Sequence, residues 1–391
     1  MLLKTYNKVF LSLVLSSSLL ASSDILSSTQ NDILNLDIKK ANQDVSKLSK
    51  DWIDKNAITY MYSYSKTNAT PVNQTNRIST LSINQSIFRS GGIYYAIKYA
   101  SNVDENSKLS LKMQKQNLIT SVLNTVYNIK KLDIQIKKQN LSLQNALIDY
   151  ENKKEAVFNG LLDISFLNNA ILIKNKTKIS LLDIKLAKQN LINKLSTLSD
   201  LKYSNIDLPS LNILTNDKFK NENLNIKQAY LNSKKQNSLS GLSNAQYLPK
   251  VSVNYSKTIN HSMNSNSYKY GFNVVVPIDL KTLNTMQSNK LAYLKTQAQI
   301  KLVKKQEEVF FKSNELEIQN ISAKIALTKQ NIKAYKKLVE QTKEQYDAGL
   351  KTSNDVKVLD NSKKSEELSV EIFEIDKQIK LLELYSKINQ N

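Results

Sequence analysis

The residues best able to do chemistry lie in one short stretch, from Tyr346 to Asp355, with the sequence YDAGLKTSND. It combines a phenol on Tyr346, an ammonium group on Lys351 and a carboxylate on Asp355. The chain has no cysteine and one histidine, His261, so thiolate chemistry is excluded and zinc, haem or triad chemistry lacks its usual ligands. We therefore predict a protein that is not an enzyme, without a metal site or cofactor, in which this stretch acts through its charges.

The same stretch reverses the direction of the chain between two helical segments. Gly349 has no Cβ, so it can adopt the positive φ that ends a helix. The residues from Thr352 to Asp355 then offer side-chain oxygens that cap the next helix, which is the simplest role for Asp355. A second reversal is predicted at Gly160, followed by Asp163, and Gly160 lies 189 residues before Gly349.

Other features recur at nearly the same distance, which indicates two tandem copies of one unit. Tyr64-Ser-Lys-Thr67 returns as Tyr255-Ser-Lys-Thr258, 191 residues later. Only six Gly and four Pro occur in 391 residues, which fits long uninterrupted elements. We predict a first repeat at 24–205 and a second at 206–391.

Each repeat is predicted to contain a leading helix, a β-hairpin, a long helix, a tight tip and a return helix. Apolar residues every three to four positions indicate the helices, and strict alternation indicates the strands. At about 1.5 Å per residue each long helix measures roughly 100 Å, and its apolar stripe requires a lateral helical partner. The expected segments are 24–55, 57–88, 93–157 and 164–199, a linker at 200–220, and then 221–246, 250–278, 283–346 and 352–388.

The predicted hairpins are apolar and rich in tyrosine on one face and polar on the other, with a polar loop at 71–76 in the first. This pattern is typical of transmembrane β-barrel strands, although half-buried hairpins of a soluble α+β protein alternate in the same way. Four strands cannot close a barrel, since about eight are needed, and open edges in lipid leave backbone groups unpaired. Three chains would give twelve strands. The aromatic residues are Tyr60, Tyr62, Tyr64, Tyr268, Tyr270 and Phe272.

Residues 1–23 have the pattern of a secretory signal peptide: Lys4 and Lys8, then a short apolar run, then small residues. The run is shorter than the roughly 20 residues of a membrane-spanning helix. Cleavage would lower the net charge from +21 to +19 by removing two lysines. Such a charge can indicate binding to nucleic acid or to an anionic membrane, or it can reflect solvated lysines on the faces of helices. Trp52, before the first strand, is either a core residue or a membrane-boundary residue.

Taken in order, several short motifs resemble the TolC-like outer-membrane efflux family over nearly the whole of residues 24–391. They are Asn84-Gln85-Ser-Ile-Phe88-Arg-Ser-Gly91-Gly92 at a strand-to-helix junction, Leu248-Pro249-x-Val251, Val276-Pro277-Ile278 and the tip Tyr346-x-x-Gly349. Three features depart from the family pattern. Ser86 replaces a proline, Asp279-Leu-Lys replaces a glycine pair, and the first tip, Phe158-Asn-Gly160, is expected to be one residue shorter.

This resemblance implies a mainly α fold with a β-barrel contribution: a homotrimer with a twelve-stranded barrel in the outer membrane and a long α-helical tunnel in the periplasm. It implies a passive conduit that exports small molecules or proteins and that works with a periplasmic adaptor and an inner-membrane pump. It also implies a pore ring at Asp355, a gate contact at Tyr346, and partners at Lys351 and Asp163. The expected adaptor contacts are Gly160, Leu161, Gly349 and Leu350.

A different class of function is a soluble periplasmic coiled-coil adaptor or scaffold. Such a protein has no need for four alternating, tyrosine-rich strands, so the hairpins favour the channel. A rod that binds nucleic acid is the third hypothesis, and the predicted signal peptide argues against it. We therefore expect no nucleic-acid partner, contact with outer-membrane lipid, and a location in the outer membrane with a periplasmic extension.

Overall fold

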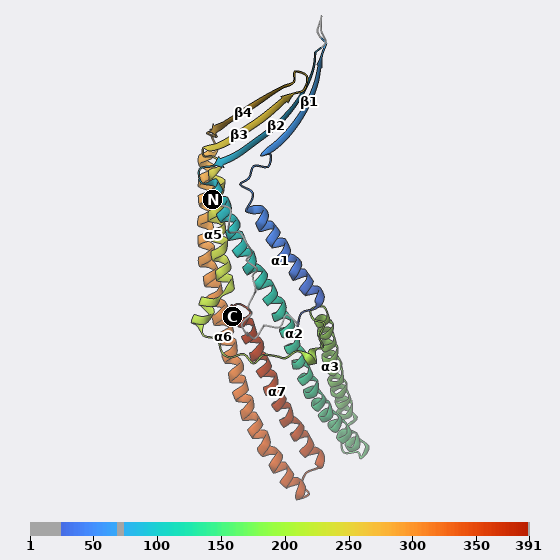
Figure 1. The fold of residues 1–391 in the computed structure, drawn as a ribbon. Coiled ribbons are helices and arrows are strands. Elements are labelled where there is room, and N and C mark those ends of the chain that lie inside the picture. The colour runs from blue at the N-terminus through green and yellow to red at the C-terminus, as the bar shows by residue number, and fades with distance from the viewer. Residues whose placement is uncertain (1–24, 69–73, 390–391) are drawn as a thin grey trace. The chain divides into compact units, whose positions relative to one another are not determined.

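The computed structural model describes residues 25–68 and 74–389, and the predicted signal peptide lies outside them. The described chain is mainly helical and has four strands (Figure 1), as the sequence predicts. The elements are α1 Ser28–Leu48, β1 Ile58–Thr67, β2 Gln74–Phe88, α2 Gly92–Phe158, α3 Ile164–Ser196, the 3₁₀ turn Tyr203–Asn205, α4 Asn216–Glu222, α5 Leu224–Ala245, β3 Lys250–Asn260, β4 Ser265–Val275, α6 Thr282–Asp347 and α7 Ser353–Tyr385.

Corresponding helices of the two halves of the chain have almost equal lengths. Helices α3 and α7 each contain 33 residues, whereas α2 and α6 contain 67 and 66. Helix α1 is shorter than the expected 24–55 because the chain leaves it after Leu48 through a series of turns. Strand β2 begins at Gln74, inside the loop expected at 71–76.

The chain divides into two compact units, and each combines segments from both halves of the sequence. One unit contains residues 1–33, 114–223 and 308–391, and the other contains 34–113 and 224–307. We call them the helical unit and the sheet unit, and we describe each by itself.

The sheet unit contains an antiparallel sheet in the order β1-β2-β3-β4 (Figure 1). Its register aligns Tyr60 with Leu81, Leu81 with Lys257 and Lys257 with Tyr268, so residues of one alternation share a face across all four strands. We call this the aromatic face and the opposite one the polar face. The register shifts between Ser86 and Phe88, so Ile87 sits in a bulge and interrupts the alternation that Leu81 and Ile83 follow.

In the helical unit, side-chain bonds connect four helices in the order α3-α2-α7-α6. Helices α3 and α2 are joined by the Lys188–Asp133 ion pair, with N and O atoms 2.6 Å apart. Helices α2 and α7 are joined by Lys131–Asp376 at 2.6 Å, and α7 and α6 by Lys380–Glu317 at 2.8 Å. Helices α3 and α6 therefore stand at the two ends of this series (Figure 1).

The core of the helical unit forms where the segment after α3 packs beside α2 and the end of α7. Val122, Val126 and Ile129 of α2 are fully buried. Phe219 of α4 is also buried, and its ring centroid lies 5.1 Å from that of Phe311. Such burial stabilises by about 1.5–3 kcal/mol per large apolar side chain.

Gln116 of α2 caps the C-terminal end of α7. Its Nε2 donates to the carbonyl oxygens of Tyr385, Ser386 and Ile388 at 3.1, 3.0 and 2.9 Å. The side chain is buried, so these bonds replace water at the end of the helix, where the Tyr385 carbonyl also accepts the Ile388 N–H at 3.4 Å.

We predict that Gln116→Leu lowers the thermal midpoint of the detergent-extracted protein, since buried carbonyls lose their donor at a cost of about 1–3 kcal/mol. Gln319→Leu, at an exposed position of α6, is the matched control and should leave the midpoint nearly unchanged. Scanning calorimetry measures both. Equal midpoints for Gln116→Leu and wild type would show that this cap does not stabilise the fold.

Candidate functional site

The two helix tips that carry the predicted gate residues have the same backbone geometry. Gly160 and Gly349 both have a positive φ, 69° and 74°. At each tip the glycine N–H bonds back three residues and the following leucine N–H bonds back five, from Leu161 to Ala156 at 2.8 Å and from Leu350 to Gln345 at 2.8 Å. This pair of backbone hydrogen bonds is the Schellman motif, which provides partners for the last carbonyl groups of the helix.

The tips also have the same length, so the expectation of a shorter first tip is wrong. Helix α2 ends at Phe158 and α6 at Asp347, and each following helix begins six residues later. Aligned on the glycines, Val157 corresponds to Tyr346, Asp163 to Thr352 and Phe166 to Asp355. The aromatic residue of the first tip, Phe158, is displaced by one position, and Asp163 is not the counterpart of Asp355.

Each tip ends in a different helix cap. Asp163 is the N-cap of α3, and its carboxylate accepts the Ser165 N–H at 2.8 Å. Thr352 is the N-cap of α7, and Asp355, three residues later, completes a capping box. The Oδ2 atom of Asp355 accepts from the Thr352 backbone N–H and hydroxyl, both at 2.9 Å.

These bonds keep both carboxyl groups ionised. Contacts with Ser165 lower the pKa of Asp163 below its ordinary value. Contacts with Thr352, assisted by the charge of Lys351, lower the pKa of Asp355 in the same direction. Each tip therefore presents a carboxylate at neutral pH.

The other predicted tip residues are exposed. Leu161 and Leu350 each expose 75% of their surface, and Tyr346 exposes 46%. Within the described residues, no hydrogen bond or ion pair joins Tyr346, Lys351 or Asp163 to the opposite tip. A contact that sequence analysis missed lies close to them, since Nδ2 of Asn354 donates to Oδ1 of Asn152 at 3.2 Å. It connects α7 to α2 within the helical unit.

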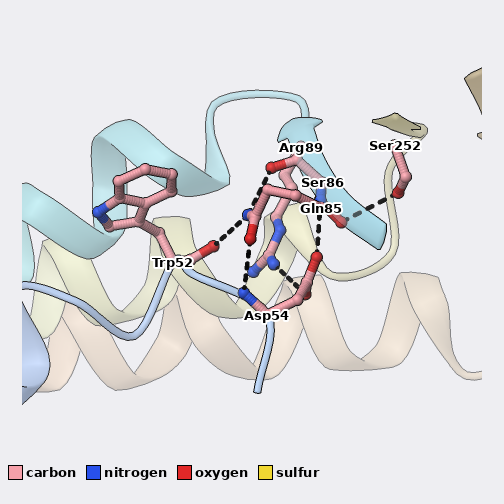
Figure 2. Close-up of polar contacts among 6 residues, drawn as sticks. All are labelled: Trp52, Asp54, Gln85, Ser86, Arg89 and Ser252. Carbon is pink, nitrogen blue, oxygen red and sulfur yellow. Dashed lines mark hydrogen bonds and ion pairs between the residues drawn. The ribbon is translucent and has the colours of Figure 1, made fainter. Parts of the chain in front are cut away.

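A second polar cluster, in the sheet unit, fixes the junction between strands and helices (Figure 2). The Asp54 carboxylate accepts the Ser86 N–H at 2.7 Å and pairs with the Arg89 guanidinium. The Gln85 side chain accepts the Asp54 N–H at 3.2 Å and donates to the carbonyl of Trp52 at 3.4 Å. These contacts tie the segment before β1 to the end of β2.

The junction corresponds to the motif from Asn84 to Gly92, so the sequence located it but did not identify Asp54 as its partner. Burial raises the pKa of Asp54, but the bonds from Ser86 and the Arg89 charge outweigh it and hold the pKa below its ordinary value. Trp52 is half-buried here, so its exposure does not distinguish a core residue from a membrane-boundary residue. A second junction contact joins the two halves of the chain, since the Ser90 hydroxyl donates to the carbonyl of Pro249 at 2.6 Å.

Among the described residues there is no group of three or more His, Cys, Asp or Glu side chains placed to hold a metal ion. No helix in the described part of the chain is long and apolar enough to cross a membrane.

Comparison with known proteins finds a family model for part of the chain and related folds for nearly all of it. Residues 217–389 match the family model of outer membrane efflux proteins. These residues form an outer membrane efflux protein domain. The resemblance predicted from the motifs is thereby confirmed. No protein of curated function matches the chain by sequence.

Solved structures of outer-membrane proteins share the fold of this chain. The outer membrane protein VceC of Vibrio cholerae is 17% identical, with a TM-score of 0.73, covering 92% of this chain and 93% of that one. The CmeC outer membrane channel of Campylobacter jejuni is 14% identical, with a TM-score of 0.72 and coverage of 93% and 83%. The MtrE outer membrane channel of Neisseria gonorrhoeae is 14% identical, with a TM-score of 0.69 and coverage of 93% and 86%.

Family and fold together support an outer-membrane efflux channel and an outer-membrane location. The alternative, a soluble periplasmic scaffold, is not favoured. The four strands in one register explain why, because a scaffold has no use for a sheet whose aromatic face is left uncovered.

We predict that Asp54→Asn lowers the thermal midpoint of the protein at pH 7, by the equivalent of about 1–2 kcal/mol, because the Arg89 charge loses its partner at a partly exposed site. The folded-state pKa of Asp54 is depressed, so the carboxylate stabilises the fold above about pH 4 and this stabilisation is lost as the pH falls through the folded-state value.

The difference between wild type and Asp54→Asn should therefore shrink below about pH 4. Asp51→Asn, three residues away and exposed, is the control and should follow wild type at every pH. Thermal melts followed by circular dichroism from pH 7 to pH 3 measure the difference. A constant difference over that range would contradict the assigned role.

Proposed function

We propose that the protein is a homotrimeric outer-membrane channel-tunnel built from two tandem helix–hairpin–helix repeats. It is a passive conduit, gated at the helix tips, through which small molecules or proteins pass from the periplasm or an inner-membrane pump to the exterior. The observation that carries this proposal is that both the sheet and the layer of helices end in unpartnered edges that copies of the same chain can close.

The sheet supplies the first pair of edges. Within the described residues β1 and β4 each pair on one side only. The aromatic face is uncovered, with Tyr60, Tyr270 and Phe272 exposing 68%, 86% and 76% of their surfaces. Lipid acyl chains can cover that apolar face, but they cannot form hydrogen bonds with the backbone groups at the edges. In a membrane, β4 of one copy must therefore pair with β1 of the next. Three copies arranged in this way give the twelve-stranded barrel.

The helices at the ends of the series supply the second pair of edges. Helix α3 exposes Leu172, Ile179 and Leu186, spaced seven residues apart. Helix α6 exposes Val309 and Leu316 at the same spacing, followed by Leu327 and Leu338 at intervals of eleven. Repeats of seven and eleven are those of helices that pack lengthwise against another helix. The α3 stripe of one copy and the α6 stripe of the next would therefore close a tunnel of twelve helices.

The tips supply the proposed gate. Three symmetric copies of Asp355 would form a ring of negative charge that attracts cations, and mutual repulsion would favour retention of some protons. Capping and a pore role are compatible, because both capping bonds fall on a single oxygen of Asp355. Tyr346, Lys351 and Asp163 would hold the closed state through bonds between helix pairs. Lysine in place of arginine gives a single-point contact rather than a bidentate one.

The exposed tips also suit a periplasmic adaptor. Leu161 and Leu350 project beyond Gly160 and Gly349, and nothing lies within 4 Å of the position that a Cβ would take on either glycine. A helical hairpin of an adaptor could approach such a surface without displacing any side chain. The adaptor would connect the channel to an inner-membrane pump.

We predict that the mature protein, extracted from the outer membrane in mild detergent, has a mass of three chains by light scattering after detergent subtraction. Leu316→Glu places a charge in the α6 stripe and should shift the mass toward a single chain. Lys324→Glu, at an exposed position beside the stripe, is the control and should remain trimeric. A wild-type protein that is monomeric and soluble without detergent would overturn the proposed function.

We predict that Asp355→Asn reduces the cation preference of single channels in planar bilayers, since three carboxylates are removed from the pore. Thr352→Ala is the matched control, because it removes the cap oxygen and leaves the charge in place. If both variants change selectivity equally, or neither does, Asp355 is a helix cap only.

A further inference from the structure

The four strands carry positive charge without any negative charge. They contain five basic residues, Lys66, Arg77, Lys250, Lys257 and Lys269, and no aspartate or glutamate. The sequence around them is also free of acidic residues, from Lys55 to Gly92 and from Gln246 to Ile278. A solvated surface normally mixes both signs, so a one-sided charge on a sheet calls for an anionic neighbour.

The register divides these charges between the two faces. Lys66, Arg77 and Lys257 have the alternation of the tyrosines and lie on the aromatic face. Lys250 and Lys269 lie on the polar face, opposite Val275 and Ser256. Three of the five charges thus belong to the face that the proposed function exposes to lipid.

Aromatic rings hold two of these cations against the sheet. The Arg77 guanidinium carbon lies 5.8 Å from the centroid of the Tyr64 ring, and Nζ of Lys257 lies 5.5 Å from that of Tyr268. Cation–π contacts of this kind orient a cation without neutralising it. Both charges remain available to an anion that approaches over the aromatic face.

His261, in the β3–β4 turn, adds a polar group at the same place. Its Nε2 lies 2.8 Å from Oγ of Ser79, which also accepts a hydrogen bond from the Tyr60 hydroxyl at 3.2 Å. The His261 backbone N–H donates to the Arg77 carbonyl at 2.8 Å, so the turn is fixed beside Arg77. The exposed imidazole of His261 can bond phosphate or sugar oxygens through its other ring nitrogen.

The position of these polar residues along the strands indicates which leaflet of the membrane they would contact. Helices lead into β1 and β3 and out of β2 and β4, so all helical connections lie at one end of the sheet. Lys66, Arg77 and His261 lie near the opposite end, where the hairpin turns are. If the helices are periplasmic, as the proposed function requires, the turns face the exterior and these residues meet the outer leaflet.

We propose that Arg77 and Lys257, together with Lys66 and His261, bind the phosphate groups of lipid A, the anionic glycolipid of the outer leaflet. Arginine and phosphate match in charge and in geometry, and long basic side chains beside tyrosines reach the headgroup level from the apolar face. Acyl chains would cover the exposed rings below. The site therefore anchors the barrel to one lipid species.

Native mass spectrometry of the detergent-purified trimer, titrated with bis-phosphorylated lipid A, tests this site. Wild type should bind it, and R77Q/K257Q should bind about 10- to 30-fold more weakly, as expected for two basic residues near an anionic headgroup. K269Q, which removes a lysine of the same strands from the polar face, should bind as wild type does. Dephosphorylated lipid A should bind no better to wild type than to R77Q/K257Q.

Equal binding by wild type and R77Q/K257Q, or an equal loss in K269Q, would overturn the proposal. Equal affinity for phosphatidylglycerol would overturn the assignment to lipid A. Trimer mass and single-channel conductance are measured on the same samples. A conducting trimer that does not bind lipid A would contradict this inference alone. A chain that neither trimerises nor conducts would contradict the proposed function.

Discussion

A backbone amide or carbonyl in the hydrocarbon layer has no water to bond with, and the proposed assembly of the sheet depends on that constraint. One chain supplies four strands, and their ladder leaves β1 and β4 with one unpaired edge each. Adding side-chain contacts cannot remove those edges. Only more strands can, and the cheapest source is a second and third copy of the same sheet. In the proposed trimer, the symmetry of the barrel would dictate the symmetry of the helical tunnel, since both belong to the same chains.

The helices associate with one another through a different kind of interaction. Packing between helices needs no backbone pairing, so it is achieved by apolar stripes and by ion pairs such as Lys188–Asp133 and Lys380–Glu317. These pairs are partly exposed and each contributes little free energy, but their geometry fixes the order of the four helices. Burial of apolar side chains, with Val122, Val126 and Ile129 fully inaccessible to solvent, contributes more stability to this unit than any of the ion pairs.

Features with a local signal could be predicted from the sequence. The period of two predicted the strands and their aromatic face, and the glycines predicted both tips, because each depends on residues a few positions apart. The Asp54–Arg89 pair and the Gln116 cap were missed because they join residues 35 and about 270 positions apart. The bulge at Ile87 could not be predicted, because one inserted residue reverses the face of a strand while leaving the composition unchanged.

Stability is distributed in a way that suits a gate at the tips. Every bond that shapes a tip is local, from the Schellman bonds at Gly160 and Gly349 to the capping box of Thr352 and Asp355. Such bonds survive when a helix pair moves as a rigid body. The contact between pairs nearest the tips is the Asn152–Asn354 hydrogen bond, between two exposed amides that water can replace. The sheet, in contrast, is joined by ladders along whole strands, and none of these can open without unpairing many backbone groups. Movement at the tips is therefore the least costly rearrangement, and a conduit that opens there leaves its barrel intact.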